Sequence, residues 1–284
     1  MLQLAVAHLQ FPTRSTKLSM SVEVREHICH RETGFQTIDI FDTDAFGRVL
    51  LLDGHIQLAE LDERAYHETL VHIPMLSIDD PRRALVVGGG DGGVLRELCK
   101  HKSLETIDMV EIDCGVVEVS QEHLPFVSAG AFGDHRVNLH IRDAFGFLDR
   151  VIDPYDLIVM DITDVYQEEG GSLSESLFTD EFYNDCRDAL SKKGLLVTQA
   201  DNNVFCPYSM QGILHTFNRL FDKSGWYQAL VPSFGGFSGY CWASKGEEVR
   251  TDFAYEAKNL DLAYLTPVTY ALAFEDLPFG LAQG

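Results

Sequence analysis

The sequence has few basic residues for its length, and this shortage limits the partners that it can bind. It contains 22 Lys and Arg residues against 44 Asp and Glu residues, a formal net charge of −22 at pH 7. Nucleic acids and anionic membranes repel a chain of this charge, so we expect neither as a partner. Cationic small molecules are compatible with it. High solubility or a salty habitat explains the acidity equally well.

Cysteine pairs and long apolar runs are also missing. The six cysteines are scattered and none forms a CxxC pair, which is typical of a reduced cytosolic protein. There is no apolar run of about 18 residues and no basic and apolar leader, so we expect a soluble, cytoplasmic protein. The spacing in His27-Ile28-Cys29-His30 fits no common zinc site, and we therefore expect no metal.

The order of predicted elements divides the chain near residue 62. Residues 1–62 favour a small β-hairpin domain, with strands at 34–41 and 48–53 and a third near 56–58. Over 63–284, strands and helices alternate, which predicts a doubly wound, Rossmann-like α/β domain with a parallel sheet covered on both faces. The predicted strands are 84–88, 106–111, 137–142, 156–161 and 194–199, with helices at 63–76 and 207–220. An antiparallel pair, 226–231 and 238–243, is expected to close the sheet.

A glycine turn follows the first strand of this second domain. Gly88, Gly90 and Gly93 fit the GxGxxG spacing of nucleotide-binding turns, and Glu111 ends the next strand, where it can hold two ribose hydroxyls. A pyrophosphate needs backbone N–H groups and no fixed anion beside it. Asp91 in the turn therefore argues against a dinucleotide and favours a nucleoside with a cationic tail.

Carboxylates follow four successive predicted strands. They are Asp91, Glu111, Asp143 and Asp161, and the carboxyl ends of parallel strands meet at one edge of a sheet. A single Asp at such a junction more often caps a helix, but four in succession fit that explanation poorly. Asp143 suits an adenine amino group, with the Ala144 backbone beside it. The pattern predicts an adenosine pocket with surplus negative charge.

Asp161 and Asp164 form the predicted reaction centre. A primary amine has a pKa near ~10, so it must lose a proton before it can attack. One carboxylate can accept that proton while the other holds the cationic substrate; a pair of loop-capping aspartates is the plainer alternative. Tyr66 and His67, on the predicted helix 63–76, can line the same cleft, although a lone His is more often a packing residue.

These motifs resemble the polyamine aminopropyltransferase family, of which spermidine synthase is the best known member. The resemblance runs from about residue 34 to 278. It rests on Leu52-Asp53-Gly54 through Gln57, Tyr66-His67-Glu68, the Gly88–Gly93 turn, Val110-Glu111-Ile112-Asp113, Asp161-x-x-Asp164 and Ser176-Leu177-Phe178-Thr179. It implies transfer of an aminopropyl group from decarboxylated S-adenosylmethionine, a co-substrate, to a diamine, putrescine by default. The products would be spermidine and methylthioadenosine, with no prosthetic group.

The resemblance also implies a role for each matching residue. Asp161 would be the proton acceptor, with Asp164 and Tyr66 placing the amine. Donor-binding residues would be Gln36, Gly88, Gly90, Asp91, Glu111, Asp143 and Ala144. Amine-binding positions would be Gln57, Tyr66, His67, Asp164, Gln199 and Phe234. Phe234 stands where many members have a tyrosine, Val165 replaces a common proline, and the loop over 166–175 carries extra residues.

Two other functions are compatible with the sequence. A methyltransferase that uses intact S-adenosylmethionine would share the fold type but give no role to Asp91 or to the Asp161 and Asp164 pair. A non-catalytic family member could bind a nucleoside or polyamine. Free strand edges in the N-terminal hairpin favour a homodimer or homotetramer.

Overall fold

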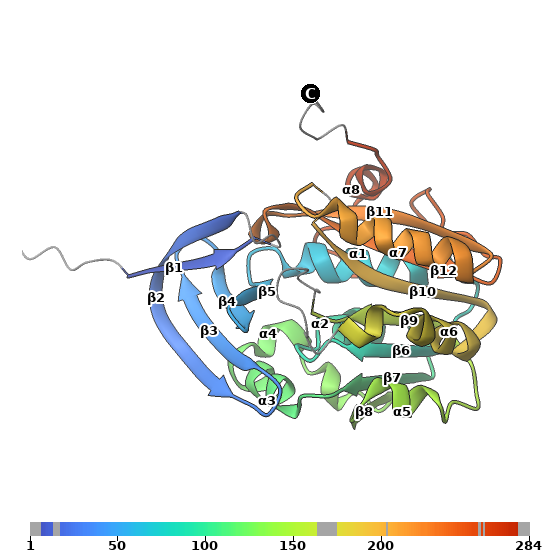
Figure 1. Cartoon of the computed structure of the whole chain (residues 1–284), viewed down its shortest axis with the longest axis horizontal. Helices are drawn as coiled ribbons and strands as arrows, with labels where there is room; N and C mark the ends of the chain where they lie inside the picture. Colours follow the sequence, from blue (N-terminus) through green and yellow to red (C-terminus); the bar gives the residue numbers. More distant parts are fainter. Residues whose placement is uncertain are drawn as a thin grey trace, which may run out of the picture.

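The computed structural model describes residues 7–13, 18–163, 175–202, 204–254, 257 and 259–277. Their strands form two sheets, one of five strands and one of seven, which lie side by side (Figure 1). The carboxyl ends of the central strands of the larger sheet point toward the smaller sheet. This arrangement places the glycine turn after β6 between the two sheets.

The N-terminal sheet is a meander in which each strand pairs antiparallel with the next. Its strands are β1 (Ala7–Pro12), β2 (Ser19–Glu32), β3 (Thr37–Thr43), β4 (Gly47–Leu52) and β5 (His55–Ala59). The predicted hairpin is β3 and β4, and the predicted third strand is β5. Ile38 and Ile40 alternate along β3 and are fully buried in a cluster with Val116 and Val119, so one face of the sheet packs on the second domain.

The larger sheet has the strand order β11-β12-β10-β9-β6-β7-β8. Its parallel strands are β6 (Arg83–Gly88), β7 (Thr106–Glu111), β8 (Val137–Ile141), β9 (Tyr155–Asp161) and β10 (Leu190–Asn202). β11 (Lys223–Val231) and β12 (Gly236–Ser244) add antiparallel strands at one edge. The predicted α/β fold, its strands and the closing antiparallel pair are thus confirmed.

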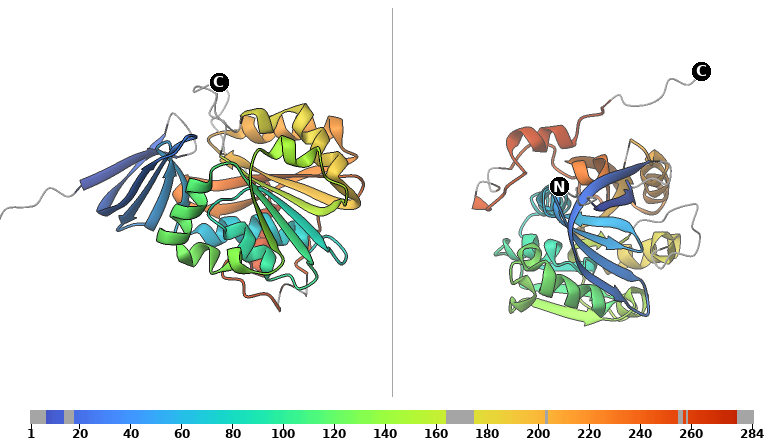
Figure 2. Two further views of the ribbon diagram at one scale, coloured as in Figure 1. Left: turned by 90° about the horizontal axis from the view of Figure 1, so that it is seen from below. Right: turned by 90° about the vertical axis from the view of Figure 1, so that its left-hand side faces the viewer.

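Helices cover both faces of this sheet (Figure 2). One face carries α1 (Glu63–Met75), α2 (Gly93–Cys99) and α8 (Pro267–Ala273), and the other carries α5 (Ala144–Leu148), α6 (Asp180–Ala189) and α7 (Pro207–Leu220). α3 (Cys114–His123) and α4 (Pro125–Ser128) pack against the N-terminal sheet and α2. Short 3-10 turns are η1 (Ala131–Gly133), η2 (Glu175–Phe178) and η3 (Pro232–Phe234). Within the described ranges, no helix is long and apolar enough to cross a membrane.

The strand order of the larger sheet reverses between its neighbouring strands β6 and β9. β7 and β8 follow on one side of β6, whereas β9 and β10 lie on the other. Such a switch point opens a crevice at the carboxyl ends of the strands. Gly88 ends β6 opposite Asp161 at the end of β9, so the turn that carries Asp91 and the predicted reaction centre share one crevice.

Candidate active site

A cavity of about 360 Å³ occupies this crevice. Its walls come from the ends of β6, β7 and β9, from α1, from β4 and β5 of the N-terminal sheet, and from the turn that precedes β3. Ten predicted site residues line it: Gln36, Gln57, Tyr66, Gly88, Gly90, Asp91, Glu111, Asp143, Ala144 and Asp161. The structure therefore brings together residues that are up to 125 positions apart, from Gln36 to Asp161.

The floor of the cavity is a turn that only glycine fits at two positions. Gly88 has φ +79°, and a Cβ there would lie 2.3 Å from the carbonyl oxygen of Asp161. A Cβ on Gly90 would lie 2.8 Å from Cγ1 of Val116 and 3.2 Å from Oε2 of Glu111. The Gly89 N–H donates to the Asp161 carbonyl at 2.8 Å. The bare backbone thus keeps open the space between the two strand ends.

Asp91 lies in the turn and is supported by a buried line of charges. Its Oδ1 accepts a 2.6 Å hydrogen bond from the Gly93 N–H and lies 3.4 Å from Nε2 of His67. His67 Nδ1 lies 2.7 Å from Glu63, which forms a two-pronged ion pair with Arg96 at 2.8 and 2.9 Å. The charges alternate in sign from Asp91 to Arg96, so each one compensates its neighbour.

His67 is a cation in this arrangement. Burial alone would lower its pKa, but the charges and hydrogen bonds of Asp91 and Glu63 outweigh burial and raise the pKa to about 10. The residue is 2% exposed and lies behind Asp91, not among the residues that line the cavity. His67 therefore contacts the carboxylate that faces the cavity. Glu63 and Arg96 were not predicted; the i, i+4 spacing of Glu63 and His67 was the available signal.

Glu111 lies at the end of β7 and is 9% exposed. Burial raises its pKa to about 7, against the hydrogen bonds that it accepts from backbone N–H groups, including that of Asp113 at 2.9 Å. Asp113, which was quoted in a motif but not predicted as a site residue, caps α3 and accepts a 3.0 Å hydrogen bond from the Gln36 side chain. Gln36 is thereby fixed between the two domains at the cavity wall.

The sequence left two interpretations of Asp143 open, a helix cap and a residue of the binding pocket. It caps α5 through a 2.9 Å hydrogen bond from the Gly146 N–H, and it also lines the cavity beside Ala144 and Arg142. Capping uses its Oδ2. Helix capping and a place on the cavity wall are thus compatible for this residue.

Asp161 and Tyr66 meet at the cavity wall. The Tyr66 hydroxyl donates a 2.7 Å hydrogen bond to Oδ1 of Asp161. The Tyr66 ring packs edge-on against Phe234, with ring centroids 5.6 Å apart. Phe234 is 2% exposed and does not line the cavity, so it supports Tyr66 from behind. Asp164 lies outside the described residues, as do Val165 and the loop over 166–174.

Gln199 contacts the site from the neighbouring strand. It lines a second cavity of about 270 Å³ together with Asp201 and Tyr208. Its side-chain amide donates to the Ile162 carbonyl at 3.0 Å and its oxygen accepts from the Asp201 N–H. It therefore holds the backbone that follows Asp161. Other lining residues that were not predicted include Arg142, Ile162, Thr163, Ser176 and Leu177.

Comparisons with known proteins identify the family of the chain. Residues 63–253 match a family model described as "Spermine/spermidine synthase domain", and residues 10–60 match a "Spermidine synthase tetramerisation domain". A polyamine aminopropyltransferase from Erwinia tasmaniensis is 38% identical over 267 residues, covering 93% of this chain and 88% of the relative. One from Pectobacterium carotovorum is 41% identical over 225 residues, covering 78% and 76%.

Two solved structures share the fold. A spermidine synthase in complex with the transition-state analogue AdoDATO superposes with a TM-score of 0.89 at 29% identity, over 98% of this chain and 94% of that one. Spermidine synthase from Thermotoga maritima gives 0.85 at 28% identity, over 98% and 92%.

The chain therefore belongs to the spermine/spermidine synthase family. It is a transferase of the polyamine aminopropyltransferase type, and its match to a tetramerisation domain indicates an oligomer.

Proposed function

We propose that the chain transfers the aminopropyl group of decarboxylated S-adenosylmethionine to a diamine, putrescine by default, and releases spermidine and methylthioadenosine. The observation that carries this proposal is the hydrogen bond between Tyr66 and Asp161 on the wall of the cavity that Asp91 also lines. A proton acceptor and an anionic anchor for an ammonium group then face one small space. An intact methionine tail would bring a carboxylate toward Asp91, which disfavours a methyltransferase.

In the proposed complex, the nucleoside lies across the ends of β6 and β7. Glu111 accepts hydrogen bonds from the ribose hydroxyls, and Asp143 with the Ala144 backbone binds the adenine. Gly88 and Gly90 leave room for the sulfonium, while Asp91 and Gln36 bind the ammonium tail. His67 acts on the tail through Asp91, because it is buried behind that carboxylate.

The proposed reaction is an in-line displacement. The amine nitrogen attacks the propyl carbon next to the sulfonium, a C–N bond forms, and the C–S bond breaks with its electron pair leaving on sulfur. The proton of the attacking nitrogen passes to Asp161. Tyr66, Asp164, Gln57 and Gln199 place the amine, and Phe234 keeps Tyr66 in position. The sulfonium is already a good leaving group, so alignment of the reactants supplies most of the rate.

We further propose that the oligomer is a homodimer or homotetramer that acts in the cytoplasm. The division into an N-terminal β domain over 1–62 and a catalytic domain over 63–284 is proposed on the separation of the two sheets. The acidity of the chain favours a cationic acceptor over nucleic acid or membrane.

The variant Asp161→Asn tests the proton-acceptor role. It keeps the size of the side chain and its bond to Tyr66, so donor affinity should be unchanged, while turnover should fall about 10²–10⁴-fold because a general base is lost. Calorimetry measures the donor affinity, and a methylthioadenosine-release assay measures the turnover. Asp153→Asn, which removes an exposed carboxylate just before β9, is the control for charge. Weakened donor binding with turnover intact would exclude the assigned role.

A further inference from the structure

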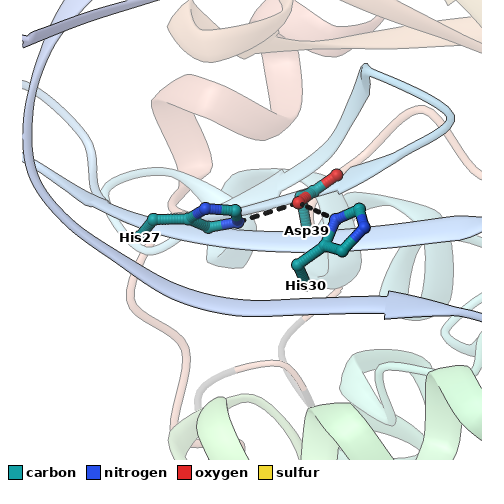
Figure 3. Close-up of side chains that lie close together, drawn as sticks. All are labelled: His27, His30 and Asp39. Atoms are coloured by element: carbon teal, nitrogen blue, oxygen red, sulfur yellow. Dashed lines mark hydrogen bonds and ion pairs between the residues drawn. The ribbon is translucent and has the colours of Figure 1, made fainter.

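The N-terminal sheet carries a cluster that the aminopropyl transfer does not use. Nε2 of His27 and Nδ1 of His30 each lie 2.8 Å from the same oxygen, Oδ1 of Asp39 (Figure 3). One ligand atom from each of the three side chains lies within 4.8 Å of the other two. None of them lines the active-site cavity.

A β-bulge in β2 brings the two histidines together. Residues three apart on a regular strand point to opposite faces, because side chains alternate. Here the pairing with β3 shifts by one residue between His27 and Cys29, so that His27 lies opposite Phe41 and His30 opposite Asp39. Since residues 39 and 41 share a face, both histidines share it too. Figure 3 shows the two rings on either side of the Asp39 carboxylate.

The same bulge removes the cysteine from this cluster. Ile28 and Cys29 both pack against the apolar cluster that contains Ile38 and Ile40, on the opposite face of β3 from Asp39. The ligand set is therefore two imidazoles and one carboxylate. Cys29 is therefore not available as a ligand in this cluster.

The cluster is accessible and partly preorganised. The side chains of His27 and His30 are 44% and 53% exposed, and that of Asp39 is 17% exposed. The His27 ring stacks on Phe41, with centroids 4.2 Å apart and planes 13° from parallel. One imidazole is thus held in place by packing and the carboxylate by its position on a central strand of the sheet.

Two imidazole nitrogens and a carboxylate oxygen are the donor set of open zinc sites, in which water completes the coordination. Bonds of about 2.0–2.2 Å would separate the ligand atoms slightly more than the observed hydrogen bonds do, and small rotations of the exposed His30 supply that change. The net charge of −22 also favours cations over anions near the surface.

We propose that His27, His30 and Asp39 form a surface site for a divalent cation of the zinc class. The sequence-based expectation of no metal rested on linear spacing, which does not account for the bulge. On binding, the cation would take the place of the hydrogens between Asp39 and the two ring nitrogens, and those protons would move to the other nitrogen of each ring or to solvent. The three residues lie in the segment that matches a tetramerisation domain. Metal binding is therefore best measured on the assembled oligomer.

The test is titration of chelator-treated full-length protein with Zn²⁺ by calorimetry, and with Co²⁺ by visible absorption. Wild type should bind one ion per chain at this site. His30→Gln keeps an amide that can bond Asp39 but removes the imidazole, and it should weaken binding about tenfold or more; His27→Ala should do the same. His135→Ala, which removes a 91% exposed histidine elsewhere, should bind as wild type does.

A second cluster of possible ligands lets the test distinguish between two metal sites. His67, Asp91 and Asp161 also approach within 4.8 Å of one another, at the active site. If Asp161→Asn abolishes metal binding while His30→Gln and His27→Ala leave it unchanged, the ion occupies the active site and the proposal is wrong. Absence of binding to wild type would equally overturn it.

Discussion

Replacing Asp91 by Asn should remove the preference for the decarboxylated donor. In the proposed complex, the carboxylate faces the ammonium of the donor tail. Two unit charges at about 4 Å interact by about 4 kcal/mol at an effective dielectric constant of 20. That value is an upper limit here, because the Gly93 N–H donates to Asp91 and His67 lies 3.4 Å from it.

Below that limit, we expect the contact between Asp91 and the donor ammonium to contribute as much as one charge-assisted hydrogen bond. Such a bond contributes about 1.5–3 kcal/mol, so Asp91→Asn should weaken binding of decarboxylated S-adenosylmethionine by roughly 10- to 150-fold. Binding of intact S-adenosylmethionine should be unchanged or tighter, because a repulsive carboxylate is removed.

Calorimetric titration with three ligands measures this effect. Methylthioadenosine is the control, since it lacks the aminopropyl tail, and its affinity should be the same for wild type and Asp91→Asn. An equal loss of affinity for all three ligands would mean that Asp91 acts by holding the glycine turn through Gly93. The electrostatic explanation would then be refuted.

Three further changes follow from the same geometry. Burial raises the pKa of Glu111 to about 7, so the affinity of wild type for methylthioadenosine should fall about tenfold per pH unit below 7. Glu111→Gln should abolish this pH dependence, which titrations at pH 6 and 8 measure. The pKa of Glu111 is higher in the folded than in the unfolded protein, so the contribution of Glu111 to stability should decrease as pH rises from about 4.5 to 7. The stability of Glu111→Gln relative to wild type, measured in urea melts, should therefore be greater at pH 8 than at pH 5, and an unchanged difference would contradict this. Tyr66→Phe removes the 2.7 Å bond to Asp161 and should lower kcat about tenfold with donor affinity retained; weaker donor binding at constant kcat would count against it. Gly93→Ala places a Cβ 2.3–2.5 Å from the His67 ring and should destabilise the fold by about 1–3 kcal/mol in urea, whereas Gly212→Ala, with open space around it, should not.

The second domain could be predicted closely because its strands are buried on both faces. Leu85, Val86 and Val87 are at most 2% exposed, and such continuous apolar runs, separated by helical patterns, are typical of a parallel sheet. The same regularity puts the acids at one edge of the sheet. The cavity wall of Asp91, Glu111 and Asp143 follows from that topology.

The first two strands of the N-terminal sheet were not predicted. β2 runs from Ser19 to Glu32, but Val22 is its one described residue that is buried. The alternation of polar and apolar residues over 19–25 was an available signal for this strand. The bulge between His27 and Cys29 interrupts that alternation in the second half of β2.

Which residues face the cavity and which lie behind them also depends on tertiary contacts. Tyr66 and His67 are adjacent on α1, yet Tyr66 faces the cavity while His67 faces the turn at Gly93. The position of Phe234 behind Tyr66 joins α1 to η3, 168 positions away in the chain. Contacts of this kind depend on how the helices pack, and local patterns carry no signal for them.

Release of methylthioadenosine from decarboxylated S-adenosylmethionine, in the presence of a panel of di- and triamines, tests the central claim most directly. The account predicts release that depends on both donor and amine, is absent with intact S-adenosylmethionine, and is lost in Asp161→Asn. No release with any amine, with the donor still bound in calorimetry, would contradict it and favour a family member that binds without reacting.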